Sequence, residues 1–314
     1  MAVVTLEQFQ KRERPTLVSA VIDSMVKRAP IMRFLPITGV EGLKIEWNEL
    51  TNRGGVVWVK PDGSADPHTN FKAAMTTSLE NASVCEVVGQ VELGHGVAKN
   101  AAEVQRNLMI RSGAMSEEWA NQFINGDGTD DKIKGLGELV STASPDQQIE
   151  GGTNGDTMTL DLVDEVIAKV SGGSGGTADI LEMSENHVNK FRSLLRTAGG
   201  ASIAEYKALE NPINMDSPSF LMYNGTIVLP NAHIGTYTKD SGTCSSLFAY
   251  KLDDGTRTRG VSGIIPDESQ MPIEVVYGGP AKDAAFYFWQ VIMLMGLANF
   301  NKQALAVRKD ILVA

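Results

Sequence analysis

The 314-residue chain is poor in the residues that build disulfide scaffolds and metal sites. It has two cysteines, Cys85 and Cys244, which lie far apart and outside any CxxC pair, and four histidines, none paired at ligand spacing. Disulfide frameworks need a dense set of cysteines, and zinc sites draw their ligands from closely spaced motifs. The sequence therefore predicts no metal site, no disulfide scaffold, and synthesis in a reducing cytoplasm.

Long apolar runs and a basic excess are also lacking. The longest apolar run, residues 284–298, is interrupted by Gln290 and Gly296 and is shorter than the ~20 residues that a membrane-spanning helix needs. We expect it to form a buried strand, and we expect no membrane partner. The N-terminus is too polar for a secretory signal. The net charge of −10 argues against a free-standing nucleic-acid binder.

The charge is divided unevenly along the chain. Residues 1–72 hold ten Lys and Arg against eight Asp and Glu, whereas residues 73–314 hold 18 against 30. The first part is therefore slightly basic and the remainder strongly acidic. If the two parts meet across subunits, this division predicts electrostatic complementarity that salt would weaken.

Two loops that could suggest ligand binding have simpler structural explanations. The GGSGGT stretch at 172–177 follows a helical pattern, whereas a phosphate loop precedes a helix and ends in Lys-Ser or Lys-Thr. The acidic loop NGDGTDD at 125–131 would place Lys132 where a calcium loop of the EF-hand type requires glycine. We predict a flexible break at 172–176, a solvated acidic turn, and no cofactor.

The candidate catalytic side chains form no recognisable constellation. No GxSxG nucleophile motif accompanies the histidines, and Asp161, Asp164 and Glu165 lie near a helix start, where the helix dipole explains acidic residues. The histidines are His68, His95, His187 and His233. We predict no catalytic residues and no enzyme activity.

The first 93 residues predict two elements that lack a core of their own. Val18, Ile22 and Met25 recur at helical spacing between Pro15 and Pro30, which indicates a short amphipathic arm. Residues 40–93 alternate as a long two-stranded hairpin with a polar tip. A short helix and a two-stranded ribbon are both marginal alone in water. Each must therefore cover another surface, in its own domain or in a neighbouring subunit.

The remaining pattern is a long helix followed by mixed helices and strands. Leu108, Met115 and Trp119 belong to an apolar face that predicts a helix over 97–124, in which Gly113 costs ~1 kcal/mol relative to alanine. Further elements are a helix capped by Thr159, a buried strand at 178–183, a helix capped by Ser184, a hairpin at 220–230 turning on Asn224-Gly225, and strands at 246–252, 273–277 and near 303–312.

This order of elements resembles the major capsid proteins of tailed bacteriophages, which have the Hong Kong 97 (HK-97-like) α+β fold. The resemblance covers essentially the whole chain. It is carried by EEWANQFINGDG (117–128), GLGELV (135–140), TADILEMSENHVNKFRSLLR (177–196) and FWQVIMLMGLANFNKQALAVRKDI (288–311). It implies an N-arm (1–39), an extended β-hairpin or E-loop (40–94), a P-domain with its long spine helix (95–154), an α/β A-domain (155–283), and strands that return to the P-domain sheet (284–314).

The resemblance also implies a function in assembly. Identical chains would form pentamers and hexamers that close into the icosahedral head of a tailed double-stranded DNA phage. The protein would then be a virion capsid component assembled in the bacterial host cytoplasm, enclosing DNA without sequence-specific binding. Expected partners are a portal protein and, in some members, decoration and scaffolding proteins. Because Met1 lies almost directly on the arm, we expect any scaffold to be a separate protein. The alternatives are an encapsulin-like compartment shell and a cytosolic α/β enzyme using 155–283.

The resemblance places the functional residues in the arm and the hairpin. The predicted inter-subunit contacts are Val18, Ile22, Met25, Trp47, Trp58, Lys60 and Phe71. The predicted points of compliance during shell expansion are Gly54, Gly55 and Gly113. A few members join a loop lysine to a neighbour's asparagine. Lys60 or Lys72 and Asn299 or Asn301 could pair in this way, or could simply be solvated surface residues.

Overall fold

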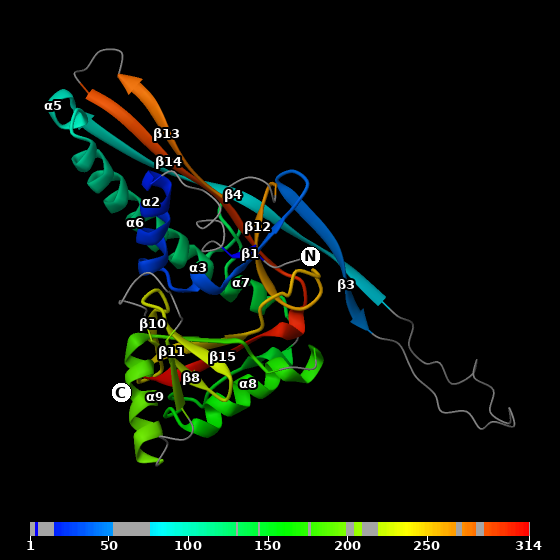
Figure 1. The fold of residues 1–314 in the computed structure, drawn as a ribbon. Coiled ribbons are helices and arrows are strands. Elements are labelled where there is room, and N and C mark those ends of the chain that lie inside the picture. The colour runs from blue at the N-terminus through cyan, green and yellow to red at the C-terminus, as the bar shows by residue number, and fades with distance from the viewer. Residues whose placement is uncertain are drawn as a thin grey trace, which may run out of the picture.

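Two β-sheets organise the chain, as seen in a computed structural model (Figure 1). The structure describes residues 4–5, 16–52, 76–129, 131–143, 145–174, 177–198, 204–208, 219–267, 272–280 and 286–313. The first sheet is elongated and carries a projecting hairpin, and the second forms a compact lower half with helices on its outer face. This mixed arrangement confirms the predicted α+β class.

The first sheet is built around the long apolar strand predicted at 284–298. Its order is β1-β2-β12-β14-β4-β3, and β13 also pairs with β14. The strands are β1 (Val4–Thr5), β2 (Pro36–Gly39), β3 (Lys44–Asn52), β4 (Thr76–Gly94), β12 (Val261–Ile265), β13 (Ile273–Pro280) and β14 (Phe286–Asn299). Because β14 lies between β12 and β4, both of its edges are hydrogen-bonded, which fits its apolar composition.

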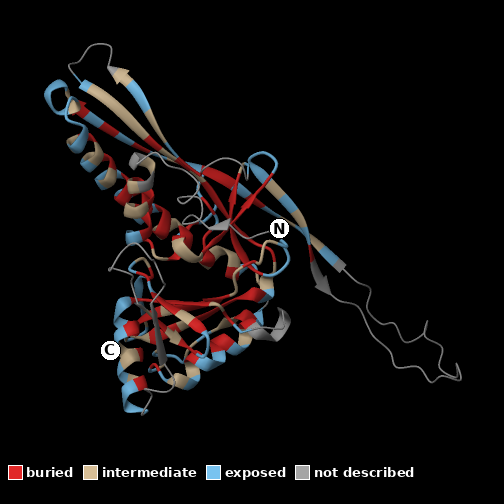
Figure 2. Ribbon diagram, viewed as in Figure 1, coloured by how far each residue is buried: buried red, intermediate tan, exposed pale blue. Residues whose placement is uncertain are grey.

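The long helix predicted over 97–124 is confirmed as α6 (Ala101–Asn125), which follows the short α5 (His95–Ala98). The side chain of Asn100 caps α6 by accepting a hydrogen bond from the backbone N–H of Ala102 at 3.1 Å. The apolar face packs against the first sheet, and Leu108, Trp119 and Phe123 are fully buried (Figure 2). The 3.6-residue period in the sequence thus identified the face that meets the core.

The arm packs on its own chain. Helix α2 (Thr16–Arg28) begins directly after Pro15, as predicted, and α3 (Ile31–Phe34) follows it. Ile22 and Met25 are 0% exposed within the single chain and belong to the core that α6 completes. The Ser116 hydroxyl of α6 also donates to the Met25 carbonyl at 2.8 Å. The apolar face of the arm is therefore already covered, and these two side chains offer no surface to a neighbour.

The second sheet has the order β5-β15-β11-β6-β9-β8-β7, and β10 also pairs with β11. Its strands are β5 (Gln148–Ile149), β6 (Ile180–Met183), β7 (Ala204–Ala208), β8 (Ser219–Tyr223), β9 (Thr226–Pro230), β10 (Thr236–Lys239), β11 (Gly242–Tyr250) and β15 (Leu305–Leu312). Helices α8 (Leu160–Ser174) and α9 (Glu185–Thr197) share a core with one face. The short α7 (Leu136–Ser141) belongs to the core on the other side.

Several local predictions for this half are confirmed. The Thr159 and Ser184 side chains accept backbone hydrogen bonds at the starts of α8 and α9. The β8–β9 hairpin turns on Asn224 and Gly225, whose φ values of +48° and +82° fit the predicted type I′ turn. The break predicted at 172–176 is wrong for its first three residues, because α8 continues to Ser174, and the last two lie outside the described residues.

Strand pairing differs from the prediction in three places. Strand β4 pairs with β3 only up to Ser83 and then pairs with β14 as far as Gly94, so the free hairpin is shorter than residues 40–93. Strands β12 and β13, within 155–283, join the first sheet, whereas β15, within 284–314, joins the second. The ranges assigned to the five domains remain a prediction.

Candidate subunit-contact surfaces

The projecting hairpin is the first candidate contact surface. We use "the hairpin" for β3 and the part of β4 paired with it, from Lys44 opposite Ser83 to Asn52 opposite Thr76. It extends away from both sheets in Figure 1. Leu43, which immediately precedes the hairpin, is 62% exposed, and Leu79, on the β4 side of the hairpin, is 64% exposed. A two-stranded ribbon that exposes large apolar side chains lacks a covering layer, so the hairpin is suited to pack on another surface.

The base of the hairpin is held by an ionic clamp. The Lys302 ammonium lies 2.5 Å from a carboxylate oxygen of Glu80 on β4 and 3.7 Å from one of Glu49 on β3. The Lys302 backbone N–H also donates to Glu49, and Trp47 packs edge-on against Phe300 at 5.1 Å between ring centroids. Both strands are thereby tied to the turn that links β14 to β15.

The two carboxylates of the clamp differ in their electrostatics. Burial raises the pKa of Glu49, and the contacts with Lys302 only partly oppose this effect. Burial also acts to raise the pKa of Glu80, but the hydrogen bond and charge of Lys302 outweigh it, so this pKa is lowered. Lys302 is therefore the group that makes the ionised clamp stable at the hairpin base.

Replacing Lys302 by methionine should loosen the hairpin. Without the ammonium the buried Glu49 carboxylate loses its charged partner, which should cost about 1–3 kcal/mol of unfolding free energy. We expect amide hydrogen exchange to accelerate in residues 44–52. Lys44→Met is the matched control, because its pair with Glu46 is half-exposed and should contribute less than about 1 kcal/mol. Equal effects from both variants would contradict the clamp.

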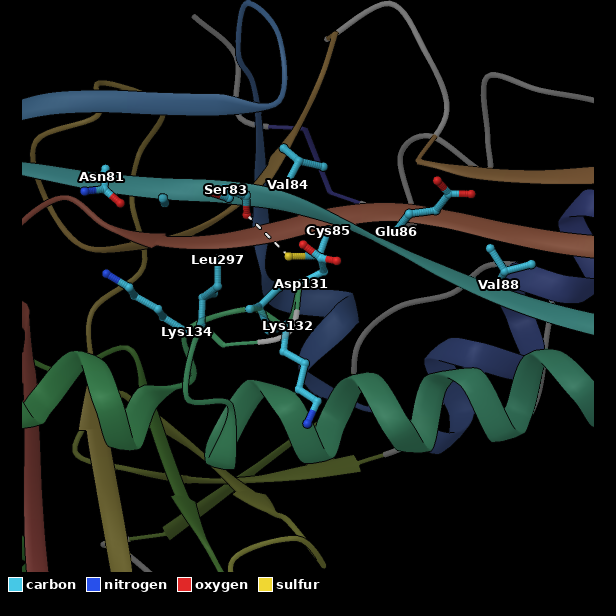
Figure 3. Close-up of a pocket in the computed structure, with 13 residues that line it drawn as sticks. Asn81, Ser83, Val84, Cys85, Glu86, Val88, Asp131, Lys132, Lys134 and Leu297 are labelled. Carbon is cyan, nitrogen blue, oxygen red and sulfur yellow. Dashed lines mark hydrogen bonds between the residues drawn. The ribbon is translucent and has the colours of Figure 1, made fainter.

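A polar groove lies beside the point where β4 leaves the hairpin (Figure 3). It has a volume of about 660 Å³ and runs between β4 residues 81–88 and the loop that follows α6. Glu86 and Asp131 supply negative charge, and Lys132 and Lys134 supply positive charge. Burial, and secondarily Asp131, raises the pKa of the Cys85 thiol, so this sulfur is a poor nucleophile. The groove is suited to a contact rather than to a reaction.

An aromatic shelf forms a third surface at the far end of the first sheet. Tyr277 of β13 stacks on Tyr287 of β14 at 6.4 Å and contacts Trp289 at 5.2 Å. Together with Ala98 and Lys99, these rings line a hollow of about 400 Å³. Tyr277 is more than half exposed. Exposed aromatic side chains of this density are typical of interaction surfaces, and neither the periodicity nor the motifs of the sequence indicated this one.

The structure separates the predicted contact residues into three groups. Val18 on α2 and Trp47 on β3 are half-buried and remain candidates for inter-subunit contact. Ile22 and Met25 lie in the core, as described above. The other predicted contacts, Trp58, Lys60 and Phe71, fall outside the described residues. So do the predicted compliance points Gly54 and Gly55 and the cross-link candidate Lys72.

The proposed cross-link partners have local structural roles. Asn299 ends β14 and is 4% exposed, and Asn301 accepts a hydrogen bond from the Gln303 backbone N–H at 3.0 Å at the start of a 3₁₀ turn, Lys302–Ala304. A cross-link to either asparagine remains a prediction.

Gly113 provides space for a side chain from α2. A methyl group added at this position would lie 2.8 Å from the Arg28 Nε atom, and the Arg28 guanidinium pairs with Glu117 one turn further along α6. The helix continues through Gly113 without a break. The structure therefore offers a simpler explanation for this glycine than compliance: the absence of a side chain leaves room for Arg28 to cross α6.

Gly113→Ala should change subunit stability by less than about 1 kcal/mol. Alanine should stabilise the helix by ~1 kcal/mol through its higher propensity. Arg28 must move aside, however, which weakens its exposed ion pair with Glu117 and should cost a similar or smaller free energy. Urea unfolding would measure the balance. A loss above about 2 kcal/mol would mean that Arg28 cannot move aside. Shells that form and expand normally with alanine at 113 would remove Gly113 from the compliance proposal.

The candidate catalytic side chains have structural partners instead. The His187 ring lies 3.1 Å from the Ser184 hydroxyl and 3.3 Å from the Leu312 carbonyl, and burial lowers its pKa. Among the described residues, the ring's hydrogen-bond partners are this hydroxyl and this carbonyl rather than a carboxylate, so no triad forms there. Asp164 accepts a hydrogen bond from Tyr223, and Glu165 pairs with Arg308. His68 lies outside the described residues.

The described part of the chain holds neither a metal-binding cluster nor a membrane-spanning helix. There, no three His, Cys, Asp or Glu side chains gather closely enough to hold a metal ion. No helix of the described segments is long and apolar enough to cross a membrane. Asp127, in the acidic loop after α6, accepts the Thr129 backbone N–H, which is a local turn contact.

Comparison with known proteins relates this architecture to shell proteins. No protein-family model and no curated protein matches the chain. Among solved structures, the SrpI encapsulin of Synechococcus elongatus PCC 7942 is 16% identical with a TM-score of 0.65, and the match covers 91% of this chain and 88% of that one. The capsid of a native GTA particle is 12% identical with a TM-score of 0.60, with 92% and 90% covered.

A third similar structure is the capsid of cyanophage A-1(L), 14% identical with a TM-score of 0.58, with 90% of this chain and 93% of that one covered. Each of these matches covers about nine-tenths of this chain. Together with the α6 spine, the projecting hairpin and the α/β lower half, they establish that the chain has the HK-97-like α+β fold.

Proposed function

We propose that this protein is a shell subunit whose identical copies assemble into a closed protein container. The observation that carries the proposal is the hairpin, which is clamped at its base yet exposes Leu79 on β4 and the adjoining Leu43. Such an element gains stability only when it lies on another surface. The likeness over about nine-tenths of the chain to an encapsulin and to two capsids supports a neighbouring copy as that surface.

The assembly mechanism follows from closed symmetry. Copies arranged in pentamers and hexamers would each place the hairpin on the next subunit, so that every hairpin is covered and no edge remains. Individual contacts can be weak, because each subunit makes several at once. The basic excess in residues 1–72 and the acidic remainder would favour the same arrangement, and high salt should then slow the first association steps.

Our first candidate for the contents is double-stranded DNA, in the head of a tailed phage assembled in the bacterial cytoplasm. The capsid matches support this reading, and the acidic body fits a container that must not adhere to packed duplex. A portal protein, and decoration or scaffolding proteins, would be the additional partners. The second candidate is a compartment that encloses protein cargo, which the SrpI encapsulin match supports. Neither requires catalysis by this chain.

Electron microscopy and sedimentation of the recombinant full chain would test the proposal. We expect rings or closed shells under some combination of salt and pH. A stable monomer or dimer under all assembly conditions would contradict a shell function. It would favour the alternative of an enzyme that uses residues 155–283. The contents of particles isolated from the native host would separate the two candidates: nuclease-protected DNA indicates a phage head, and co-purified protein indicates a cargo compartment.

A further inference from the structure

Glu182 is a carboxylic acid buried where the two halves of the subunit meet. We call this contact layer the seam: α2, α3 and α6 on one side, and the inner face of the second sheet on the other. Along β6, Leu181 and Met183 belong to the core under α8 and α9, whereas Ile180 belongs to the core of the seam. Glu182, two residues after Ile180, shares its side of the strand and is 1% exposed.

The partners of Glu182 are both uncharged. The Tyr250 hydroxyl donates to one carboxylate oxygen at 3.1 Å, and the Asn231 side-chain amide donates to the other at 3.2 Å. Among the described side chains, no cation forms an ion pair with it. Buried Arg308, in contrast, contacts the two carboxylates of Asp156 and Glu165. A buried charge without a countercharge is costly, so the site favours the neutral acid.

A small cavity of about 50 Å³ adjoins Glu182 and is lined from both sides of the seam. Arg28, Pro30 and Ala120 contribute from the first half, and Leu229, Asn231 and His233 from the second. The volume is sufficient for a water molecule. Proton uptake or water entry at this point would therefore be felt by both halves at once.

The ionisable groups around Glu182 come from three elements. Arg28 at the end of α2 is already paired with Glu117, His233 follows β9, and Tyr250 lies on β11. Helix α6 contributes the uncharged Ala120. His233 is an imidazole that lines the same cavity, so an experiment must distinguish its effect from that of Glu182.

We infer that Glu182 makes the seam a proton-controlled joint: it is closed while this carboxyl carries a proton, and ionisation draws water into the cavity and loosens the contact between the two halves. The inference goes beyond the proposed shell function, because it concerns a single subunit. In a shell, such a joint would let the angle between the halves respond to pH.

The direction of the effect follows from the shifted acidity. Burial raises the pKa of Glu182 from 4.5 to about 7, although the hydrogen bonds from Asn231 and Tyr250 oppose the shift. A raised pKa means that the closed seam binds the proton more tightly than an open, hydrated one. The extra stability is fully present below about pH 4.5 and is lost as pH rises to about 7.

Hydrogen exchange of the full chain between pH 5 and 8, corrected for intrinsic rates, would test the joint. In the wild type, protection of the amides at 229–234 and 28–32 should fall roughly tenfold per pH unit between pH 5 and 7. In Glu182→Gln, a neutral mimic of the protonated acid, the change should be less than about twofold over the same range. Undiminished pH dependence in this variant would overturn the inference.

Three further variants make the test specific. His233→Gln should retain the wild-type profile, and loss of the pH dependence there would assign the effect to the histidine instead. Tyr250→Phe removes a hydrogen-bond donor to the Glu182 carboxylate and should move the midpoint of the pH profile upward. This variant keeps the inference testable if Glu182→Gln does not fold. Glu274→Gln, on the exposed part of β13, controls for charge and should leave the profile unchanged.

Discussion

Replacing residues 53–75 by an Asn-Gly turn should abolish shell formation while leaving the subunit folded. Asn52 and Thr76 face each other across the hairpin, so a two-residue turn can join them without changing the strand register. The Lys302 clamp and the Trp47–Phe300 contact hold the base in place. Because the proposed contact recurs once per subunit around every ring, its loss should remove the particle peak completely in sedimentation.

The control for this deletion keeps the length and removes the side chains. A glycine-serine segment that replaces 53–75 residue for residue preserves the number of residues but lacks Trp58, Lys60 and Phe71. If these side chains supply the contact, this variant should also fail to assemble, and circular dichroism should report folded subunits in both cases. Shells of normal size and yield from the deletion variant would contradict the role in assembly assigned to residues 53–75.

Met25→Ala should destabilise the isolated subunit by about 2–5 kcal/mol, whether or not shells form. The Met25 side chain is fully buried between α2 and α6, so its removal leaves a cavity in the core rather than a gap at an interface. Urea unfolding of unassembled subunits would measure the loss. The hydrogen bond from Ser116 reaches the Met25 backbone and should survive the substitution.

Val18→Ala is the matched control for Met25→Ala. Val18 lies on the same helix but is only half-buried, so its truncation should cost less than about 1 kcal/mol in the isolated subunit. If Val18 contacts a neighbour, its effect should appear in assembly instead. A Met25→Ala subunit of unchanged stability that no longer assembles would restore Met25 to the interface.

Local elements were predictable because their signals are local. The start of α2 after Pro15, the Ser184 cap and the Asn224-Gly225 turn each depend on a few adjacent residues. The pairing partners of the long strands could not be predicted in the same way. The alternation in β4 shows which of its residues face inward, but it does not show which strand lies beside it. The switch of β4 from β3 to β14 at residues 83–84 depends on a strand some 200 residues away in the chain.

The contact surfaces were predictable only in part. The spacing of Val18, Ile22 and Met25 correctly identified an apolar helix face, but periodicity cannot tell whether the covering surface belongs to the same chain. The aromatic shelf is assembled from two strands, β13 and β14, so no single stretch of sequence displays all of it. Glu182 did leave a signal: with Asp179, it is one of two acidic residues in the predicted buried strand at 178–183, whose other residues are apolar.

The position of the last two strands bears on how the chain reaches its native state. Strand β14 lies between β12 and β4 in the first sheet, and β15 lies between β5 and β11 in the second. During vectorial synthesis the strands made earlier must wait with open edges until residues 286–312 emerge from the ribosome. Contacts of such long sequence separation close slowly. Subunits should therefore become competent to associate late, after synthesis, which would keep growing chains on one message from joining prematurely.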